Sequence, residues 1–130
     1  MMWKIVLPVL AVLVSVGLSD LVGGPLEINI HEDEGAQSAL NFAVVEHNRR
    51  SNALFLSKPA EVISTKRQLV AGYLYTITVR MGMTPCRKNN ANELCAIHED
   101  PEKARPYECT FTVYTRPWLS ETTLKSQVCS

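Results

Sequence analysis

Three histidines and four cysteines are the side chains of this sequence best suited to catalytic chemistry. His47 belongs to the apolar stripe of a predicted helix, so we expect it to be a core or half-buried residue. His31 and His98 each precede two acidic residues, and we expect them on solvated surface. A Cys–His nucleophile requires a free thiol, whereas we expect every cysteine here to be oxidised. Because the sequence also contains no G-x-S-x-G, H-E-x-x-H or glycine-rich phosphate motif, we predict no catalytic residues and no enzyme activity.

Residues 1–19 have the layout of a secretory signal peptide. A positively charged start, Met1–Lys4, precedes the apolar run Ile5–Val16, and the small residues Gly17 and Ser19 follow. A membrane-spanning helix is the alternative, but the uncharged run is shorter than the roughly 20 residues needed to cross a bilayer. We therefore expect a secreted, extracellular domain of residues 20–130 that does not associate with membranes.

All the cysteines lie in the last third of the chain, and they are Cys86, Cys95, Cys109 and Cys129. An even number of cysteines in a short secreted chain indicates disulfides, for which three pairings are possible. Their spacing contains no C-x2-C pair, so we predict neither a metal site nor a cofactor.

The overall composition excludes two further classes of protein. Lys and Arg number 13 and Asp and Glu number 13, a neutral balance that argues against a nucleic-acid-binding protein. Hydrophobic residues make up 46% of the chain and charged residues 20%, which argues against a disordered chain.

The segment from Asp33 to Arg50 has the periodicity of an amphipathic α-helix, preceded by an extended arm, Asp20–Glu27. Asp33 is suited to the helix start, where a carboxylate accepts from free amides. The expected buried stripe is Ala36, Ala39, Leu40, Ala43, Val44 and His47, widened by Phe42 and Val45.

The remainder of the chain has the alternation of consecutive strands. After the apolar run Leu54–Leu56 we expect Pro59 to interrupt the chain and a strand to begin at Val62. A second strand, Tyr73–Arg80, alternates most clearly. We expect 82–106 to be a polar surface excursion, followed by strands at 109–116 and 119–129. One helix followed by sequential strands predicts an α+β fold with an antiparallel sheet.

The last two strands can be aligned by arithmetic. If Cys109 and Cys129 face each other, their midpoint is residue 119, beside the break at Pro117-Trp118. Opposed residues of antiparallel strands have Cα atoms about 4.5–5.5 Å apart, a spacing that a disulfide accepts. By elimination, this pairing predicts Cys86–Cys95 as the second disulfide.

Three segments are apolar where the chain is expected to be exposed: the arm residues 21–24, the turn at 69–72 and Pro117-Trp118. Exposed apolar loop tips indicate recognition, and Trp is enriched at the energetic centres of interfaces. Alternatives are that Trp118 fills the core and that the strand simply continues through Leu69-Val70.

These segments and the cysteine layout resemble the type 2 cystatins. The resemblance rests on Gly23, on the Q-x-V-x-G pattern at Gln68–Gly72, on Pro117-Trp118 and on two C-terminal disulfides, and it covers residues 20–130 in order. It implies the cystatin fold, a five-stranded antiparallel sheet wrapped around one long α-helix.

The same resemblance implies tight, reversible inhibition of papain-like (C1) cysteine proteases such as cathepsins by a monomer. The arm and both hairpins would form a wedge that enters the protease cleft. The protease-binding residues that it implies are Leu21, Val22, Gly23, Gln68, Leu69, Val70, Ala71, Gly72, Pro117 and Trp118. The competing interpretation is a secreted carrier or antimicrobial module of the same fold without inhibitory activity.

A further site is suggested by Ser51-Asn52, directly after the predicted helix. Some family members inhibit legumain, an asparagine-specific protease, through an Asn at this place, although Ala53 follows here where those members often have Asp. The alternative is that Asn52 only ends the helix, a position that suits Asn because it tolerates a left-handed backbone.

Overall fold

The structure is a computed structural model that describes residues 24–88 and 95–130. Its main elements are β1 (Leu26–Glu27), α2 (Glu34–Arg50), β2 (Phe55–Val70), β3 (Gly72–Arg87), α3 (Pro101–Ala104), β4 (Tyr107–Arg116) and β5 (Glu121–Cys129). The predicted signal peptide lies outside the described residues. Within them, no helix is both long and apolar enough to span a membrane.

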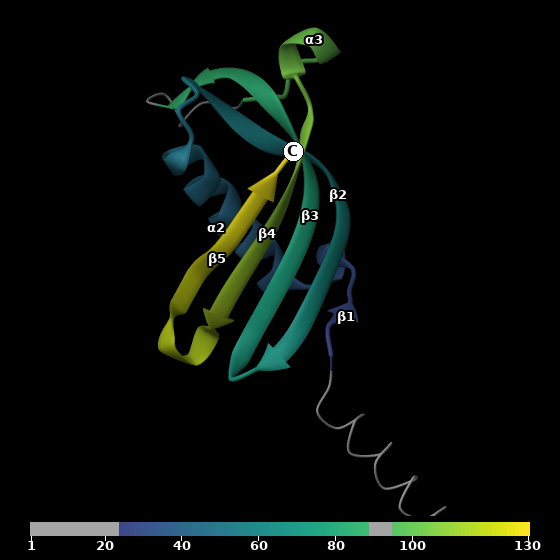
Figure 1. The fold of residues 1–130 in the computed structure, drawn as a ribbon, viewed down its shortest axis with the longest axis vertical. Helices are drawn as coiled ribbons and strands as arrows, with labels where there is room; N and C mark the ends of the chain where they lie inside the picture. Colours follow the sequence, from purple (N-terminus) through teal and green to yellow (C-terminus); the bar gives the residue numbers. More distant parts are fainter. Residues whose placement is uncertain (1–23, 89–94) are drawn as a thin grey trace, which may run out of the picture.

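The five strands form one antiparallel sheet in the order β1-β2-β3-β4-β5. The long helix α2 lies across one face of this sheet (Figure 1), and the chain connects neighbouring strands in sequence. The predicted α+β fold, a five-stranded antiparallel sheet wrapped around one helix, is therefore confirmed.

The helix begins where the sequence predicts. Asp33 is its N-cap, and the carboxylate accepts a 3.0 Å hydrogen bond from the backbone N–H of Ala36. The face that packs on the sheet consists of Ala36, Ala39 and Ala43, all buried. The expectation for Val45 was wrong: its side chain is 57% exposed, whereas Leu40, Phe42 and Val44 are half-buried and pack against the core beside the alanines.

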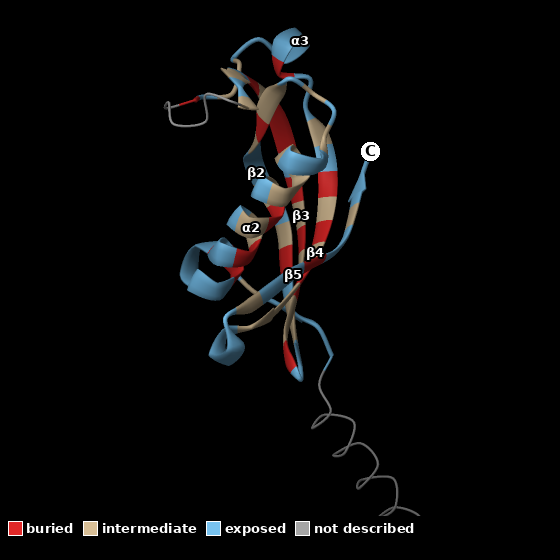
Figure 2. Ribbon diagram, turned by 90° about the vertical axis from the view of Figure 1, so that its left-hand side faces the viewer, coloured by how far each residue is buried: buried red, intermediate tan, exposed pale blue. Residues whose placement is uncertain are grey.

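The larger side chains of the core come from the sheet. Ile77 and Val79 on β3 and Phe111 and Val113 on β4 have no exposed surface. Figure 2 shows buried residues along these strands where they face α2. Alanines on the helix leave room for these side chains, so the sheet can lie close to the helix axis.

Both predicted disulfides are present. Cys109 and Cys129 are directly opposed partners of β4 and β5, as the midpoint argument predicts. Cys86 on β3 is bonded to Cys95. Between β4 and β5 the chain turns through a short 3-10 helix, Pro117–Leu119, rather than starting the last strand at Leu119.

Two predicted boundaries were wrong. Pro59 does not interrupt the chain, because β2 continues through it with an irregularity before Glu61. No described strand pairs with the outer edge of β2 at this point, so the missing proline N–H removes no bond on that side. The segment Gly82–Arg87 is not a surface excursion either; it extends β3 and pairs with β2 as far as Phe55.

Candidate functional site

The first hairpin, between β2 and β3, ends in a tight apolar turn. We call residues 68–72 tip 1. β2 runs through Val70 and β3 begins at Gly72, so Ala71 alone separates them. β2 therefore continues through Leu69-Val70, as the alternative interpretation of the sequence stated. Even so, Leu69 is 69% exposed and Val70 is also exposed, so tip 1 presents apolar side chains to solvent.

The second hairpin, between β4 and β5, ends in the 3-10 helix 117–119, which we call tip 2. Ser120 closes it with a left-handed backbone (φ 51°), and its N–H donates to the carbonyl of Pro117 at 3.0 Å. Trp118 is 63% exposed, so the alternative that it fills the core was wrong. Leu119, which the sequence analysis assigned to the last strand, is also exposed and extends the apolar surface beside Trp118.

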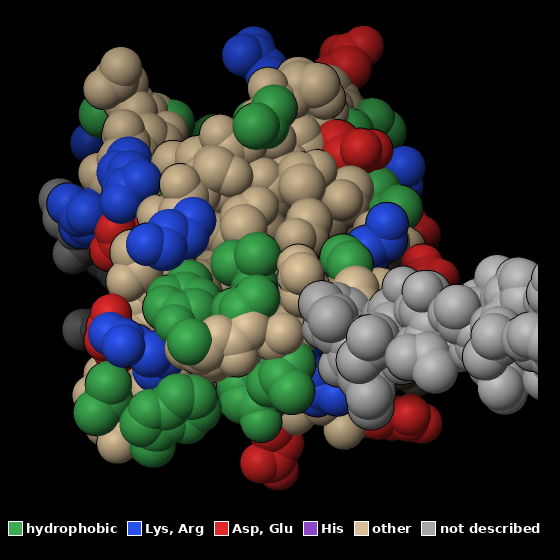
Figure 3. Space-filling model, turned by 60° about the horizontal axis from the view of Figure 1, so that its bottom comes forward, with side chains coloured by type: hydrophobic (Ala, Val, Ile, Leu, Met, Phe, Trp, Pro, Cys, Tyr) green, Lys and Arg blue, Asp and Glu red, His purple; other side chains and the backbone are tan. Residues whose placement is uncertain are grey.

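Both tips lie at the same end of the sheet because β3 pairs with β2 on one side and β4 on the other. Tyr73, directly after tip 1, is the register partner of Thr115, directly before the residues that lead into tip 2. Figure 1 shows the two hairpins side by side at the lower end of the molecule. Seen from that end, hydrophobic side chains gather on the surface with Lys and Arg side chains beside them (Figure 3).

The N-terminal strand runs along the outer edge of β2 near tip 1. Leu26 pairs with Arg67, immediately before tip 1, and is itself exposed. The arm residues Leu21, Val22 and Gly23 lie outside the described residues, so their part in the predicted wedge stays a prediction.

Tip 1 is held against β4 by close contacts at Gly72, which has φ 136°, a conformation that favours glycine. A Cβ at this position would lie 2.8 Å from the carbonyl oxygen of Thr115 and 2.9 Å from Cγ of Arg116. The hydroxyl of Tyr114 donates a hydrogen bond to the carbonyl of Ala71. Sequence reasoning missed Tyr114 because this contact joins residues far apart in the chain.

A polar cluster supports the tips from the helix side. Asp33 and Arg67 form a 2.8 Å ion pair, and the Arg67 guanidinium lies 5.8 Å from the ring centroid of Tyr73. Burial, and then the charge of Asp33, raise the pKa of Tyr75. These groups line a cavity of about 620 Å³ between α2 and the hairpins. Because Asp33 and Arg67 bind each other, we assign them to supporting the hairpin end.

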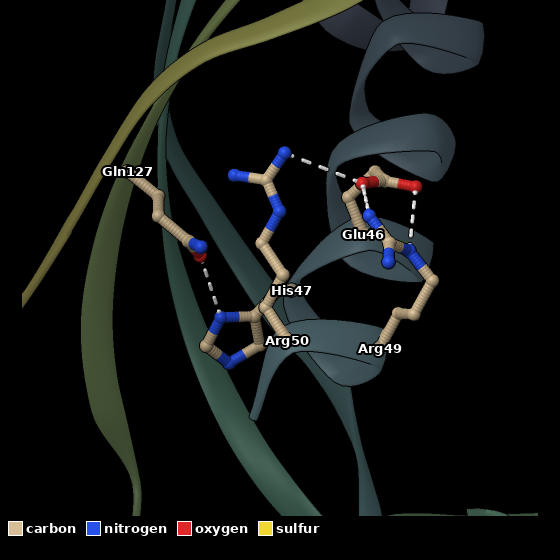
Figure 4. Close-up of polar contacts among 5 residues, drawn as sticks. All are labelled: Glu46, His47, Arg49, Arg50 and Gln127. Atoms are coloured by element: carbon tan, nitrogen blue, oxygen red, sulfur yellow. Dashed lines mark hydrogen bonds and ion pairs between the residues drawn. The ribbon is translucent and has the colours of Figure 1, made fainter. Parts of the chain in front are cut away.

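The histidine nearest the core has a structural environment. In Figure 4, His47 on α2 points toward Gln127 on β5, and its Nδ1 lies 2.9 Å from the amide oxygen. Its Nε2 lies 2.7 Å from the hydroxyl of Tyr107. The prediction of a half-buried His47 is confirmed. The nearby sulfur atoms of Cys109 and Cys129 are bonded to each other, so they offer no thiolate to a metal.

The other two histidines differ in exposure. His31 is on the surface, as predicted. His98 is half-buried, which corrects the prediction for it: its backbone N–H donates to the carbonyl of Met83 at 3.1 Å. Sequence reasoning missed this contact because it joins the segment before α3 to the extension of β3.

The end of α2 carries a charged cluster. Arg49 and Arg50 both contact the carboxylate of Glu46, as Figure 4 shows, at 2.6 and 3.4 Å. The hydrogen bond from Arg49 lowers the pKa of Glu46. These cations also face the negative end of the helix dipole, so the cluster stabilises the end of the helix.

The predicted second site, Ser51-Asn52, lies at the opposite end of the molecule from the tips, directly after α2. Asn52 is exposed, and among the described non-glycine residues only Arg105 and Ser120 have positive φ. Asn52 therefore does not have the left-handed backbone that often ends a helix, although it directly follows the C-cap Ser51. The loop is anchored by Lys88, whose Nζ donates to the carbonyl of Ser51 at 2.5 Å.

Comparisons with known proteins agree with this geometry. A family model described as the cystatin domain matches residues 23–118. A cystatin of Oncorhynchus keta is 46% identical over 129 residues, which are 99% of this chain and 98% of that relative. A cystatin-C of Paralichthys olivaceus is 52% identical over 129 residues, 98% of this chain and 100% of the relative.

Solved structures are similar as well. The crystal structure of dimeric human cystatin F superposes with a TM-score of 0.74 and 27% identity, covering 83% of this chain and 86% of that one. The crystal structure of Al-CPI superposes with a TM-score of 0.68 and 28% identity, covering 83% of this chain and 100% of that one.

The contacts at Gly72 generate a stability prediction. We expect Gly72→Ala to lower the free energy of unfolding by about 1–3 kcal/mol, because it combines an unfavourable φ with a backbone collision. Gly24→Ala is the matched control, since a Cβ there meets no atom within 4 Å. Urea unfolding of both variants measures the difference, and equal stabilities would contradict the assigned role of Gly72.

Proposed function

The chain belongs to the cystatin family, and from that membership we propose that it is a tight, reversible inhibitor of papain-like (C1) cysteine proteases such as cathepsins. The family and fold support inhibition of cysteine proteases as the general function. The observation that carries the finer proposal is the placement of two exposed apolar tips at one end of the sheet, beside the N-terminal strand.

The tips have the physical properties of an inhibitory wedge. Each is a short turn between long paired strands, so little conformational entropy is lost when it binds. On binding, the exposed apolar side chains of both tips would leave water and pack against the walls of the protease cleft. These side chains are Leu69 and Val70 on tip 1 and Trp118 on tip 2. In the proposed complex, Leu21 and Val22 occupy substrate subsites and Gly23 lets the backbone turn away from the catalytic thiol.

We also propose that the domain acts outside the cell, as a monomer of residues 20–130. Two disulfides, Cys86–Cys95 and Cys109–Cys129, are typical of small secreted domains. Removal of residues 1–19 as a signal peptide belongs to the same proposal.

The wedge predicts which truncations weaken inhibition. We expect Trp118→Ala to raise the Kd for papain about thirtyfold or more, because loss of an interface-centre residue typically costs at least 2 kcal/mol. Leu69→Ala should weaken binding as well. Its matched control Leu54→Ala should not, because Leu54 is 67% exposed but directly precedes β2, at the end of that strand opposite tip 1. Titration of active papain measures all three variants.

The arm gives a further prediction. Gly23→Glu should also weaken binding in this titration, because its side chain would block close approach of the arm.

Two results of that titration would contradict the proposal. A chain that folds but shows no stoichiometric inhibition would favour the competing interpretation, a carrier or antimicrobial module of the cystatin fold. A Trp118→Ala variant that loses thermal stability while its folded fraction binds papain normally would remove Trp118 from the wedge.

We propose, as a second activity, inhibition of legumain through Asn52. The observation that favours it is an exposed Asn on an anchored loop at the end of the molecule opposite the tips. A protease specific for asparagine must bind the carboxamide by hydrogen bonds, and such a site strongly rejects side chains that lack this group.

The second activity predicts a selective variant. Asn52→Lys should abolish legumain inhibition and leave the Kd for papain nearly unchanged, because Asn52 and the tips lie on separate surfaces. Asn41→Lys, on the exposed face of α2, is the matched control and should affect neither enzyme. Inhibition assays with each protease, and a test for simultaneous binding of both, measure this. Legumain inhibition that survives Asn52→Lys, or competition between the two proteases, would exclude the proposed site.

A further inference from the structure

Tyr114 connects the two hairpins through both ends of its side chain. Its hydroxyl donates to the carbonyl of Ala71, the residue at the turn of tip 1. The Arg116 guanidinium carbon lies 5.9 Å from its ring centroid, and the Lys125 ammonium lies 5.6 Å from it. Both distances are within the range of cation–π attraction.

Arg116, which contacts the Tyr114 ring, is itself held within the second hairpin. Arg116 and Glu121 are opposed partners at the closing position of the β4–β5 hairpin, and their side chains form an ion pair. Arg116 thus contacts both Tyr114 and Glu121, the first residue of β5 after tip 2. An unbroken series of contacts therefore runs from the turn of tip 1, through Tyr114 and Arg116, to the base of tip 2.

Although tip 1 is a short turn, its conformation depends on the hydrogen bond from Tyr114. Ala71 is exposed, and its carbonyl lies at a turn, where the ladder of β2 and β3 has ended. Gly72 lies against β4 through its backbone alone, next to the Tyr114 hydroxyl. Within the described part of the chain, the Ala71 carbonyl accepts its hydrogen bond from the Tyr114 hydroxyl.

We propose that Tyr114 is a positioning residue of the inhibitory surface: it fixes tip 1 relative to tip 2 so that both can enter one protease cleft together. This inference rests on the proposed inhibition of C1 proteases. A tip that adopts its binding conformation for only part of the time binds with an affinity reduced by that fraction. Tyr114 therefore acts on affinity through the conformation of the free inhibitor, without needing to contact the protease.

The experiment compares two hydroxyl removals on the same strand. Tyr114→Phe should raise the Kd for papain about three- to tenfold, the ratio that one neutral hydrogen bond contributes, mostly through a slower association rate. Tyr107→Phe is the matched control, because its hydroxyl contacts His47, away from the tips. It should leave the Kd unchanged. The melting temperature of Tyr114→Phe should stay close to that of the parent chain.

Backbone relaxation by NMR tests the positioning without any protease. The order parameters of Val70, Ala71 and Gly72 in the free chain should fall in Tyr114→Phe and not in Tyr107→Phe. Unchanged order parameters would overturn the inference. If wild-type chain fails to inhibit papain while the order parameters fall as expected, the proposed function is wrong and the anchoring role of Tyr114 stands.

A double-mutant cycle identifies the tip through which Tyr114 acts. In a background where tip 1 has lost its apolar contacts (Leu69→Ala with Val70→Ala), Tyr114→Phe should weaken papain binding much less than in the parent chain. In the Trp118→Ala background its effect should remain in full. Equal effects in both backgrounds would overturn the inference, as would a Kd that Tyr114→Phe leaves unchanged.

Discussion

The close approach of the helix to the sheet depends on side-chain size along one face of α2. Ala36, Ala39 and Ala43 end at Cβ, and large residues of β3 and β4, such as Ile77 and Phe111, fill the space in front of them. Full burial of each large side chain contributes about 1.5–3 kcal/mol. A larger residue in the alanine face would force the sheet away from the helix, at a typical cost of about 1–3 kcal/mol. The three alanines thus allow the large side chains of β3 and β4 to pack directly against α2.

This arrangement separates the residues that stabilise the fold from those proposed to bind proteases. The core is complete within the middle of the strands, so the apolar side chains of tip 1 and tip 2 are not needed to fill it. The core does not explain why these side chains are exposed, whereas the proposed binding of proteases does. Since β3 is the shared neighbour of β2 and β4, its pairing with both places the tips at one end of the sheet. The proposed legumain site at Asn52 lies at the other end of the domain, where α2 stops.

Local patterns in the sequence predicted the parts of this structure that local physics determines. The start of α2 followed from a capping carboxylate at Asp33, and the Cys109–Cys129 pairing followed from hairpin symmetry. Wrong boundaries occurred where pairing between distant segments decides. Pro59 is tolerated because it lies on an open edge, and residues 82–87 form strand because β2 pairs with them. The types of residue at the tips were predictable, whereas the anchor at Tyr114 was not, since no pattern connects it with Ala71.

The central claim is that both tips bind one protease surface at the same time. Amide hydrogen exchange of the chain, free and in complex with papain, tests it most directly. The account predicts slower exchange on binding at Leu69–Gly72 and at Trp118–Ser120 together, and no change at Ser51–Leu54. Slower exchange at one tip alone, or at Ser51–Leu54 in place of the tips, would contradict it.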